Sequence, residues 1–388
     1  MKRKLALFTF FDALGWEIYQ HYGFMADETC AAKPLETVFG FSSAADPSIL
    51  SGRYPESHGH WSSFYYAPEK SPFKLMKWIS HLPRKIFDRW RIRHWLSKIL
   101  AKAYGYTGYF EIYSVPFGAL PHFDYLEKRD YFVPGGLLQG DTIFDWLTQR
   151  GIPYHCSNWR LSEVENLQAL KSEIQAGEIN FAYLYLPALD GLMHGVGTRH
   201  EKVAAKLRWY EEELRKVLAL AREHYDEVSF YAFSDHGMAD VIGSINLIEK
   251  IEATGLRYGE DYIAMYDSTM ARFWFPNPQA RAKVETALSQ VQQGRMLNAE
   301  DYRRWHCDFG DPRFGELIFL LQPGWLIVPS YMGLQAIPGM HGYDPADKDS
   351  YACVLSNRPL PETMHDLTDL RALMEAEVSD LVRKEALV

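Results

Sequence analysis

The run LALFTFFD, residues 5–12, decides the fold class, because a short apolar segment ends there in a single carboxylate, Asp12. A continuous apolar run of this length predicts a strand that is buried on both faces of a sheet. The basic start MKRK is also typical of a signal peptide, but Asp12 interrupts the run and no small-residue cleavage site follows. We therefore favour a buried first strand.

Two later runs repeat this pattern, FAYLYL at 181–186 and VSFYAFS at 228–234. Helical patterns occupy 141–151 and 200–224. The alternation of apolar strands with helices predicts an α/β protein whose parallel sheet is covered on both faces. In such sheets, reactive groups gather just beyond the carboxyl ends of the strands.

Three carboxylates and three imidazoles lie near these strand ends or in glycine-flanked turns: Asp12, Asp190, His194, Asp235, His236 and His341. Carboxylate oxygens and neutral imidazoles are good ligands for Zn²⁺ and similar ions. Each residue alone has a plainer explanation, such as a helix cap, a pair on a helix surface or a loop residue. Their joint occurrence favours a site for two ions, which would clamp the attacking and leaving oxygens of a displacement at phosphorus.

A candidate nucleophile lies in FSSAADPSILSGRYPESHG, residues 41–59, where Ser42 and Ser43 precede a turn-rich loop. A serine oxygen held by a metal ion is deprotonated near neutral pH and can attack phosphorus. The motifs SSAADPSILSGRYPESHG, DGLMH, SDHGM and GMHGYDP follow Asp12 in this order through nearly the whole chain. This order resembles the alkaline phosphatase superfamily, and it is most similar to the type I phosphodiesterase and nucleotide pyrophosphatase branch.

The resemblance implies a fold and a nucleophile. The implied fold is an α/β, alkaline-phosphatase-like three-layer fold with a central, mostly parallel sheet, formed by one catalytic domain over 1–388 with inserted cap segments. In that family the nucleophile, a threonine or serine, lies ten residues before the glycine of a turn. Counting back from Gly52 gives Ser42.

The resemblance also implies two divalent metal ions as cofactors, with zinc favoured and manganese as the alternative. The first ion would be held by Asp190, His194 and His341. The second would be held by Asp12, Asp235, His236 and the Ser42 oxygen. Ser43, Asp46 and Arg53 are the expected substrate contacts.

The implied activity is hydrolysis of a phosphodiester or nucleotide pyrophosphate bond in a small phosphorylated substrate, through a phospho-serine intermediate. Two alternatives remain at this point. The chain could be a phosphomonoesterase or phosphotransferase of the same superfamily, or a non-catalytic protein that retains metal and binds an anion or a membrane.

Two segments interrupt the strand–helix alternation, 60–135 and 255–335, and we expect both to be insertions over the sheet edge. Within the first, 69–102 holds ten Lys and Arg against two acidic residues, together with three tryptophans. It could be a cap helix on the acidic body, which we slightly favour, a contact with an anionic membrane, or a cationic rim for the substrate. In the second insertion, 267–276 and 313–330 predict strands of a small α/β lobe.

Composition narrows the expected partners and location. The net charge of -9 argues against binding of nucleic acid as a polymer. The four cysteines are far apart, which is typical of reduced thiols in a cytosolic protein. We therefore expect a cytoplasmic protein, peripheral at the membrane if 69–102 binds lipid; the sequence carries no signal for an oligomeric state.

Overall fold

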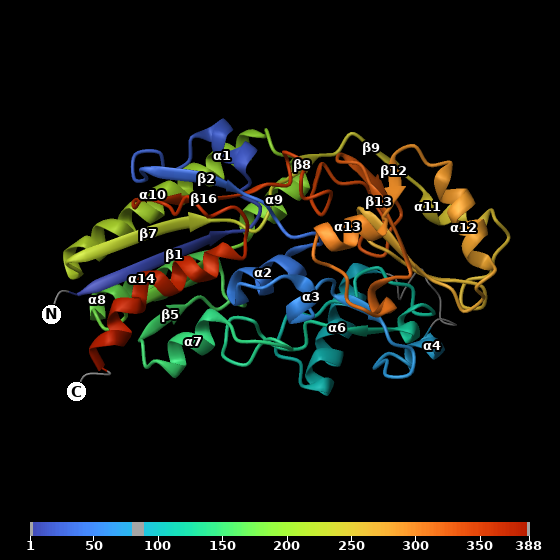
Figure 1. Cartoon of the computed structure of the whole chain (residues 1–388), viewed down its shortest axis with the longest axis horizontal. Coiled ribbons are helices and arrows are strands. Elements are labelled where there is room, and N and C mark those ends of the chain that lie inside the picture. The colour runs from blue at the N-terminus through green and yellow to red at the C-terminus, as the bar shows by residue number, and fades with distance from the viewer. Residues whose placement is uncertain (1–2, 80–88, 386–388) are drawn as a thin grey trace.

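The computed structural model describes residues 3–79 and 89–385, and its centre is a six-stranded sheet (Figure 1). The strand order is β2-β16-β7-β1-β6-β5. The strands are β1 (Lys4–Phe11), β2 (Ala31–Leu35), β5 (Tyr154–Cys156), β6 (Phe181–Leu186), β7 (Glu227–Phe233) and β16 (Ala352–Ser356). The predicted strands at 5–11, 181–186 and 228–234 are confirmed to within one residue.

The first strand lies in the middle of the sheet and is parallel to both of its neighbours, β6 and β7. Its side chains alternate between two cores, with Phe8 and Phe10 on one face and Leu5 and Leu7 on the other. The Phe8 ring stacks on Tyr231 of β7 at 4.6 Å between centroids. Because β16 alone runs antiparallel to its neighbours, the sheet is mostly parallel, as the resemblance implied.

Helices cover both faces of the sheet and complete a three-layer α/β architecture (Figure 1). On one face lie α2 (Ser42–Ser51), α7 (Ile143–Gln149) and α14 (Asp369–Glu385). On the other lie α1 (Trp16–Tyr22), α8 (Glu163–Ala176), α9 (Ala188–Val196) and α10 (Glu201–His224). The predicted helices at 141–151 and 200–224 correspond to α7 and α10. The predicted three-layer α/β fold with a central, mostly parallel sheet is confirmed.

The two predicted insertions pack together in a second lobe. The first carries β3 (Phe64–Tyr66), α4 (Met76–Ile79), α6 (Trp90–Tyr104), a 3-10 turn η1 (Leu120–His122) and β4 (Phe123–Tyr125). The second carries the antiparallel sheet β10-β11-β13-β12. Its strands are β10 (Ile263–Tyr266), β11 (Met270–Trp274), β12 (Gly294–Met296) and β13 (Leu317–Leu321), accompanied by α12 (Ala280–Ser289), α13 (Ala299–Arg304) and the 3-10 turn η2 (Pro312–Phe314). The helix α11 (Leu247–Glu252) directly precedes this insertion.

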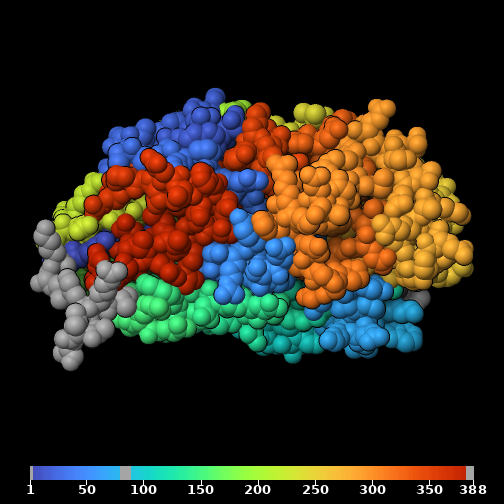
Figure 2. Space-filling model, in the orientation of Figure 1, coloured from blue at the N-terminus to red at the C-terminus, as the bar shows by residue number. Residues whose placement is uncertain are grey.

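One hydrophobic core joins these insertions, since Phe73 and Phe123 from the first pack in the same cluster as Phe273 and Val284 from the second. Figure 2 shows the light-blue and orange segments side by side on the right of the molecule, away from α14 on the left. The strands predicted within 267–276 and 313–330 are confirmed. The boundaries of the single catalytic domain and its two inserted segments stay a prediction.

Short elements link the lobe to the sheet: α3 (Pro55–His58), β8 (Ala239–Asp240), β9 (Gly243–Ile245), β14 (Trp325–Ile327) and β15 (Gly339–Met340). β14 pairs with β9, and β15 pairs with β8. In the part of the chain that the structure describes, no helix combines the length and the apolar character that crossing a bilayer requires.

Candidate active site

The carboxyl edge of the sheet collects the predicted metal ligands. Asp12 directly follows β1, and Asp235 and His236 follow β7 on the neighbouring strand. Asp190 and His194 lie one turn apart on α9, the helix that follows β6. Parallel strands place their carboxyl ends at the same edge, so residues from distant parts of the sequence meet there.

Two further elements complete the site. His341 directly follows β15, which pairs with β8 just after His236. Ser42 is the first residue of α2, and its Oγ lies 3.3 Å from Nε2 of His236. The structure thus brings Ser42 to the group that contains the predicted metal ligands.

The six acidic and imidazole residues form two groups of three. Within each group the potential ligand atoms lie within 4.8 Å of one another, and the groups are Asp190, His194 and His341, and Asp12, Asp235 and His236. The His236 and His341 rings stack at 3.7 Å between centroids, so the two groups are adjacent. This is the grouping that the resemblance implied.

Backbone carbonyls orient two of the imidazoles. Nδ1 of His194 donates to the Gly339 carbonyl at 2.8 Å, and Nδ1 of His236 donates to the Gly237 carbonyl at 2.9 Å. These bonds leave Nε2 of both rings for a metal ion, as is common in metal sites. Close packing needs glycine at both positions, because a Cβ on Gly339 would lie 2.6 Å from the Met193 carbonyl oxygen, and one on Gly237 would lie 2.2 Å from that of Asp349.

Several potential ligand atoms are buried without a hydrogen bond, including Oδ1 of Asp12, Oδ1 of Asp190 and Oδ2 of Asp235. They approach imidazole nitrogens at 3.6, 3.2 and 3.0 Å without hydrogen-bond geometry. Leaving a buried carboxylate oxygen unsatisfied is costly, whereas coordination to a cation would satisfy it. The residues present therefore fit divalent metal ions.

The electrostatics of the protein groups point to the same need for positive charge. Burial and the charges of Asp235 and Asp190 raise the pKa of Asp12 well above its usual value. Burial disfavours the charged form of His236, but the charges of Asp235 and Asp190 and the hydrogen bonds of the ring together outweigh it and raise the pKa of His236 to about 9. Burial, with the charge of His236, lowers the pKa of His341 well below its usual value, which keeps this imidazole neutral and able to bind a metal.

The four residues predicted as nucleophile or substrate contacts lie in different places. Ser42, Ser43 and Asp46 line a cavity of about 690 Å³ that also contains Asp12, Asp190 and His341. Oγ of Ser43 donates to the Trp61 carbonyl at 3.3 Å. Arg53 follows the far end of α2, is exposed and is absent from the cavity lining. The prediction that Arg53 contacts substrate therefore has no support from its position.

The sequence interpretation missed much of the cavity wall. The insertions contribute Ser62, Ser63, Tyr109, Glu127, Asp130, Phe132 and Asp267, and the segment after β5 contributes Trp159. The aromatic stretch 104–113 belongs both to the core of the second lobe and to the cavity wall, because Ile112 packs in that core while Tyr109 lines the cavity.

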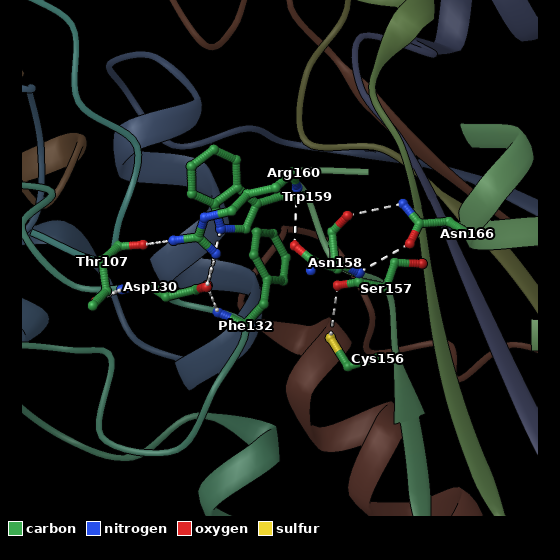
Figure 3. A network of polar contacts seen from close by, with 9 residues as sticks. All are labelled: Thr107, Asp130, Phe132, Cys156, Ser157, Asn158, Trp159, Arg160 and Asn166. Carbon is green, nitrogen blue, oxygen red and sulfur yellow. Dashed lines mark hydrogen bonds and ion pairs between the residues drawn. The ribbon is translucent and has the colours of Figure 1, made fainter. Parts of the chain in front are cut away.

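Asp130 fixes part of this wall (Figure 3). Its Oδ2 accepts from Nε1 of Trp159 and from Nη1 of Arg160, both at 3.0 Å, and its Oδ1 accepts from the Phe132 amide at 3.0 Å. Arg160 also donates to the Thr107 carbonyl. Figure 3 shows these side chains converging from three separate segments, which holds two aromatic rings of the cavity in place.

Comparison with known protein families agrees with this arrangement. The model of the type I phosphodiesterase / nucleotide pyrophosphatase family matches residues 24–344. The chain belongs to this family. It is therefore a phosphoric ester hydrolase of the phosphodiesterase/nucleotide pyrophosphatase type, in a family that typically depends on divalent metal. A search of the curated proteins gave no match.

Solved structures share the fold. Murine ectonucleotide pyrophosphatase / phosphodiesterase 5 aligns with a TM-score of 0.69 and 16% identity, covering 97% of this chain and 95% of that chain. The human counterpart gives a TM-score of 0.68 at the same identity and coverage. An inactive variant of the murine protein, in complex with AMP, gives 0.67 at 16% identity, again covering 97% and 95% of the two chains. At this level of identity the likeness shows the fold.

Proposed function

We propose that the chain hydrolyses a phosphodiester or nucleotide pyrophosphate bond at a two-metal site, with Ser42 as the nucleophile and zinc as the favoured metal. The observation that carries this proposal is the convergence of two ligand groups and one serine at the carboxyl edge of the sheet. When bound, divalent ions supply Lewis acidity and make a coordinated hydroxyl nucleophilic near neutral pH.

Asp190, His194 and His341 would hold one ion, and Asp12, Asp235, His236 and Ser42 the other. Ser42 Oγ attacks phosphorus and gives up its proton, and the bond from phosphorus to the leaving oxygen breaks. The leaving oxygen takes up a proton and departs as an alcohol or a phosphate, while the phosphoryl group, which still carries its second ester group, is bonded to Ser42. Water then attacks the phospho-serine and regenerates the hydroxyl.

The start of α2 supports the role of Ser42. The Ala44 and Ala45 amides donate to the Phe41 carbonyl, whereas the Ser42 and Ser43 amides have no acceptor among the described residues. Free amides at the start of a ten-residue helix favour a phosphoryl oxygen beside the nucleophile.

The charges of the cavity favour a diester over a monoester. Arg129 is the sole Lys or Arg among the described residues that line the cavity. Arg160 is paired with Asp130, which is itself a residue of the cavity wall. A monoester brings a second negative charge, which this acidic lining would oppose. A diester or pyrophosphate diester carries one charge on each phosphorus and is accommodated more readily.

Several aromatic rings support a nucleotide as the substrate. Tyr109, Phe132, Trp159 and Tyr185 line the cavity, and rings of this kind bury the flat apolar face of a base. The structural relative in complex with AMP is consistent with such a ligand.

The test is turnover of bis-nitrophenyl phosphate and a nucleotide nitrophenyl diester by the purified protein loaded with Zn²⁺ or Mn²⁺, beside nitrophenyl monophosphate and sulfate. We expect the diesters to be cleaved fastest. Faster cleavage of the monophosphate would support the monoesterase alternative. Metal binding without turnover of any ester would support the non-catalytic alternative.

A further inference from the structure

The helix α6 presents an exposed face that the catalytic proposal leaves unexplained. We propose that this face docks the enzyme on an anionic membrane surface. The cationic face of α6 is defined here by Arg91, Lys98 and Lys102, with Trp90 and Trp95 beside them. Figure 1 places α6 at the edge of the molecule, on the side of the second lobe.

The inner side of α6 is fixed to the protein. Arg93, Ser97 and Leu100 are buried on it. Nη1 of Arg93 donates to the Tyr113 and Val115 carbonyls at 3.0 and 2.7 Å, and Oγ of Ser97 donates to Glu111 at 2.6 Å. These contacts fix which side of the helix points outward.

The outward side carries three cations in one row. Arg91, Lys98 and Lys102 are spaced by seven and four residues, so they project from the same side of a helix with 3.6 residues per turn. All three are exposed, and none has an ion pair or a side-chain hydrogen bond to any residue within 3–79 and 89–385. The row therefore presents three positive charges that no described residue pairs with.

Two large rings flank this row and remain in solvent. Trp90 is 71% exposed and Trp95 is 68% exposed. Trp78, at 74%, and Leu75, at 72%, add exposed apolar area on or next to α4 in the same insertion. Tryptophan beside Lys and Arg is the side-chain combination that binds the headgroup region of a bilayer, where the ring is partly buried and the cations meet anionic lipid.

Charge complementarity selects a membrane as the occupant. The chain as a whole carries a net charge of -9, so an anionic surface repels the body and attracts this face. Docking in this orientation would bring the catalytic cavity near the lipid, because the segment after α6 contributes Gly108, Tyr109 and Tyr113 to its wall.

The experiment is co-sedimentation of the whole chain with vesicles of phosphatidylcholine alone or mixed with equal phosphatidylglycerol. The test variant is Arg91→Gln, Lys98→Gln, Lys102→Gln. The matched control is Lys202→Gln, Arg208→Gln, Lys283→Gln, which removes the same charge from exposed positions on α10 and α12. We expect binding to the mixed vesicles alone, about 100-fold weaker in the test variant and unchanged in the control.

A second variant, Trp90→Ser, Trp95→Ser, separates the rings from the charge. It should also weaken binding, and the emission of native tryptophan should shift to the blue on mixed vesicles. Turnover of bis-nitrophenyl phosphate in solution should be equal in all variants, so failure here is distinguishable from failure of the catalytic proposal. Equal vesicle binding by the test variant and the native chain would overturn the inference. A dimer of the native chain in light scattering, absent in the variant Trp90→Ser, Trp95→Ser, would also overturn the inference, because a second copy of the chain would then cover this face.

Discussion

Replacing Ser42 with alanine should abolish turnover, whereas the same change at Ser43 should not. The two side chains are neighbours in sequence but have different surroundings. Oγ of Ser42 faces the metal-ligand groups, 3.3 Å from Nε2 of His236, while Oγ of Ser43 donates to the Trp61 carbonyl. One hydroxyl is therefore positioned to react, and the other is engaged in a structural bond.

The expected magnitudes differ by several orders. Loss of a hydrolase nucleophile costs about 10⁴- to 10⁶-fold in turnover, which corresponds to about 5 to 8 kcal/mol in the activation barrier. Ser43→Ala loses one hydrogen bond, which costs about 1 kcal/mol of folding stability and should change kcat/KM by less than about tenfold. Ser42→Thr keeps a hydroxyl and should retain measurable turnover.

The assay is kcat/KM for bis-nitrophenyl phosphate, with the melting temperature and metal content of each variant measured in parallel. Rapid acid quenching of the reaction, followed by mass spectrometry of the peptide that contains 41–59, should find a nitrophenyl phosphoryl group in the native chain and none in Ser42→Ala. Equal loss of activity in the two alanine variants would refute the choice of nucleophile. A phosphoryl group found on Ser43 would refute it as well.

Three further outcomes follow from the same geometry. Removal of metal by a chelator should lower the melting temperature of this 388-residue chain by about 3 °C for each site occupied at 100 times its Kd, and an unchanged melting temperature would contradict metal binding. Burial raises the pKa of Glu127 to about 7, although the hydrogen bond from Ser63 acts in the opposite direction. The free energy of unfolding should therefore fall by up to about 3 kcal/mol as pH rises from about 4.5 through 7, because the folded state holds a proton that the unfolded state has lost. Glu127→Gln should flatten this fall when unfolding by denaturant is measured across the same pH range. Asp267→Asn should lower the free energy of unfolding by about 3 to 5 kcal/mol, because the fully buried Arg272 loses its charged partner at 2.8 Å. Adding Arg272→Met should recover most of that loss, and no recovery would show that the unpaired charge of Arg272 is not the cause.

Three of the six strands of the central sheet, β1, β6 and β7, could be predicted from the sequence, because a continuous apolar segment of this length favours a buried strand. β1, β6 and β7 are buried on both faces, so each appears as a continuous apolar run that ends at a polar residue. The acidic and imidazole residues were found for the same reason, since they follow these strands or stand beside glycine. Local sequence and position in the fold are directly linked at such places.

The residues of the cavity wall could not be predicted in this way, because their local sequence does not indicate where they lie in the fold. Glu127 and Asp130 come from the long first insertion, and Trp159 from the segment after β5, and only tertiary packing brings them together. Arg53 was proposed as a substrate contact because it is near Ser42 in sequence, and its position gives that prediction no support. The helix α2 has ten residues, and at a rise of about 1.5 Å per residue it separates its two ends by about 15 Å.

The number of metal ions bound by each chain tests the two-metal site most directly. Elemental analysis of the native protein, equilibrated with Zn²⁺ and freed of excess, should find two ions for each chain. Asp12→Ala and Asp190→Ala each remove one ligand, from different groups, and each variant should keep one ion, at the group that is left intact. A single ion in the native protein, or loss of the same ion in both variants, would contradict the account.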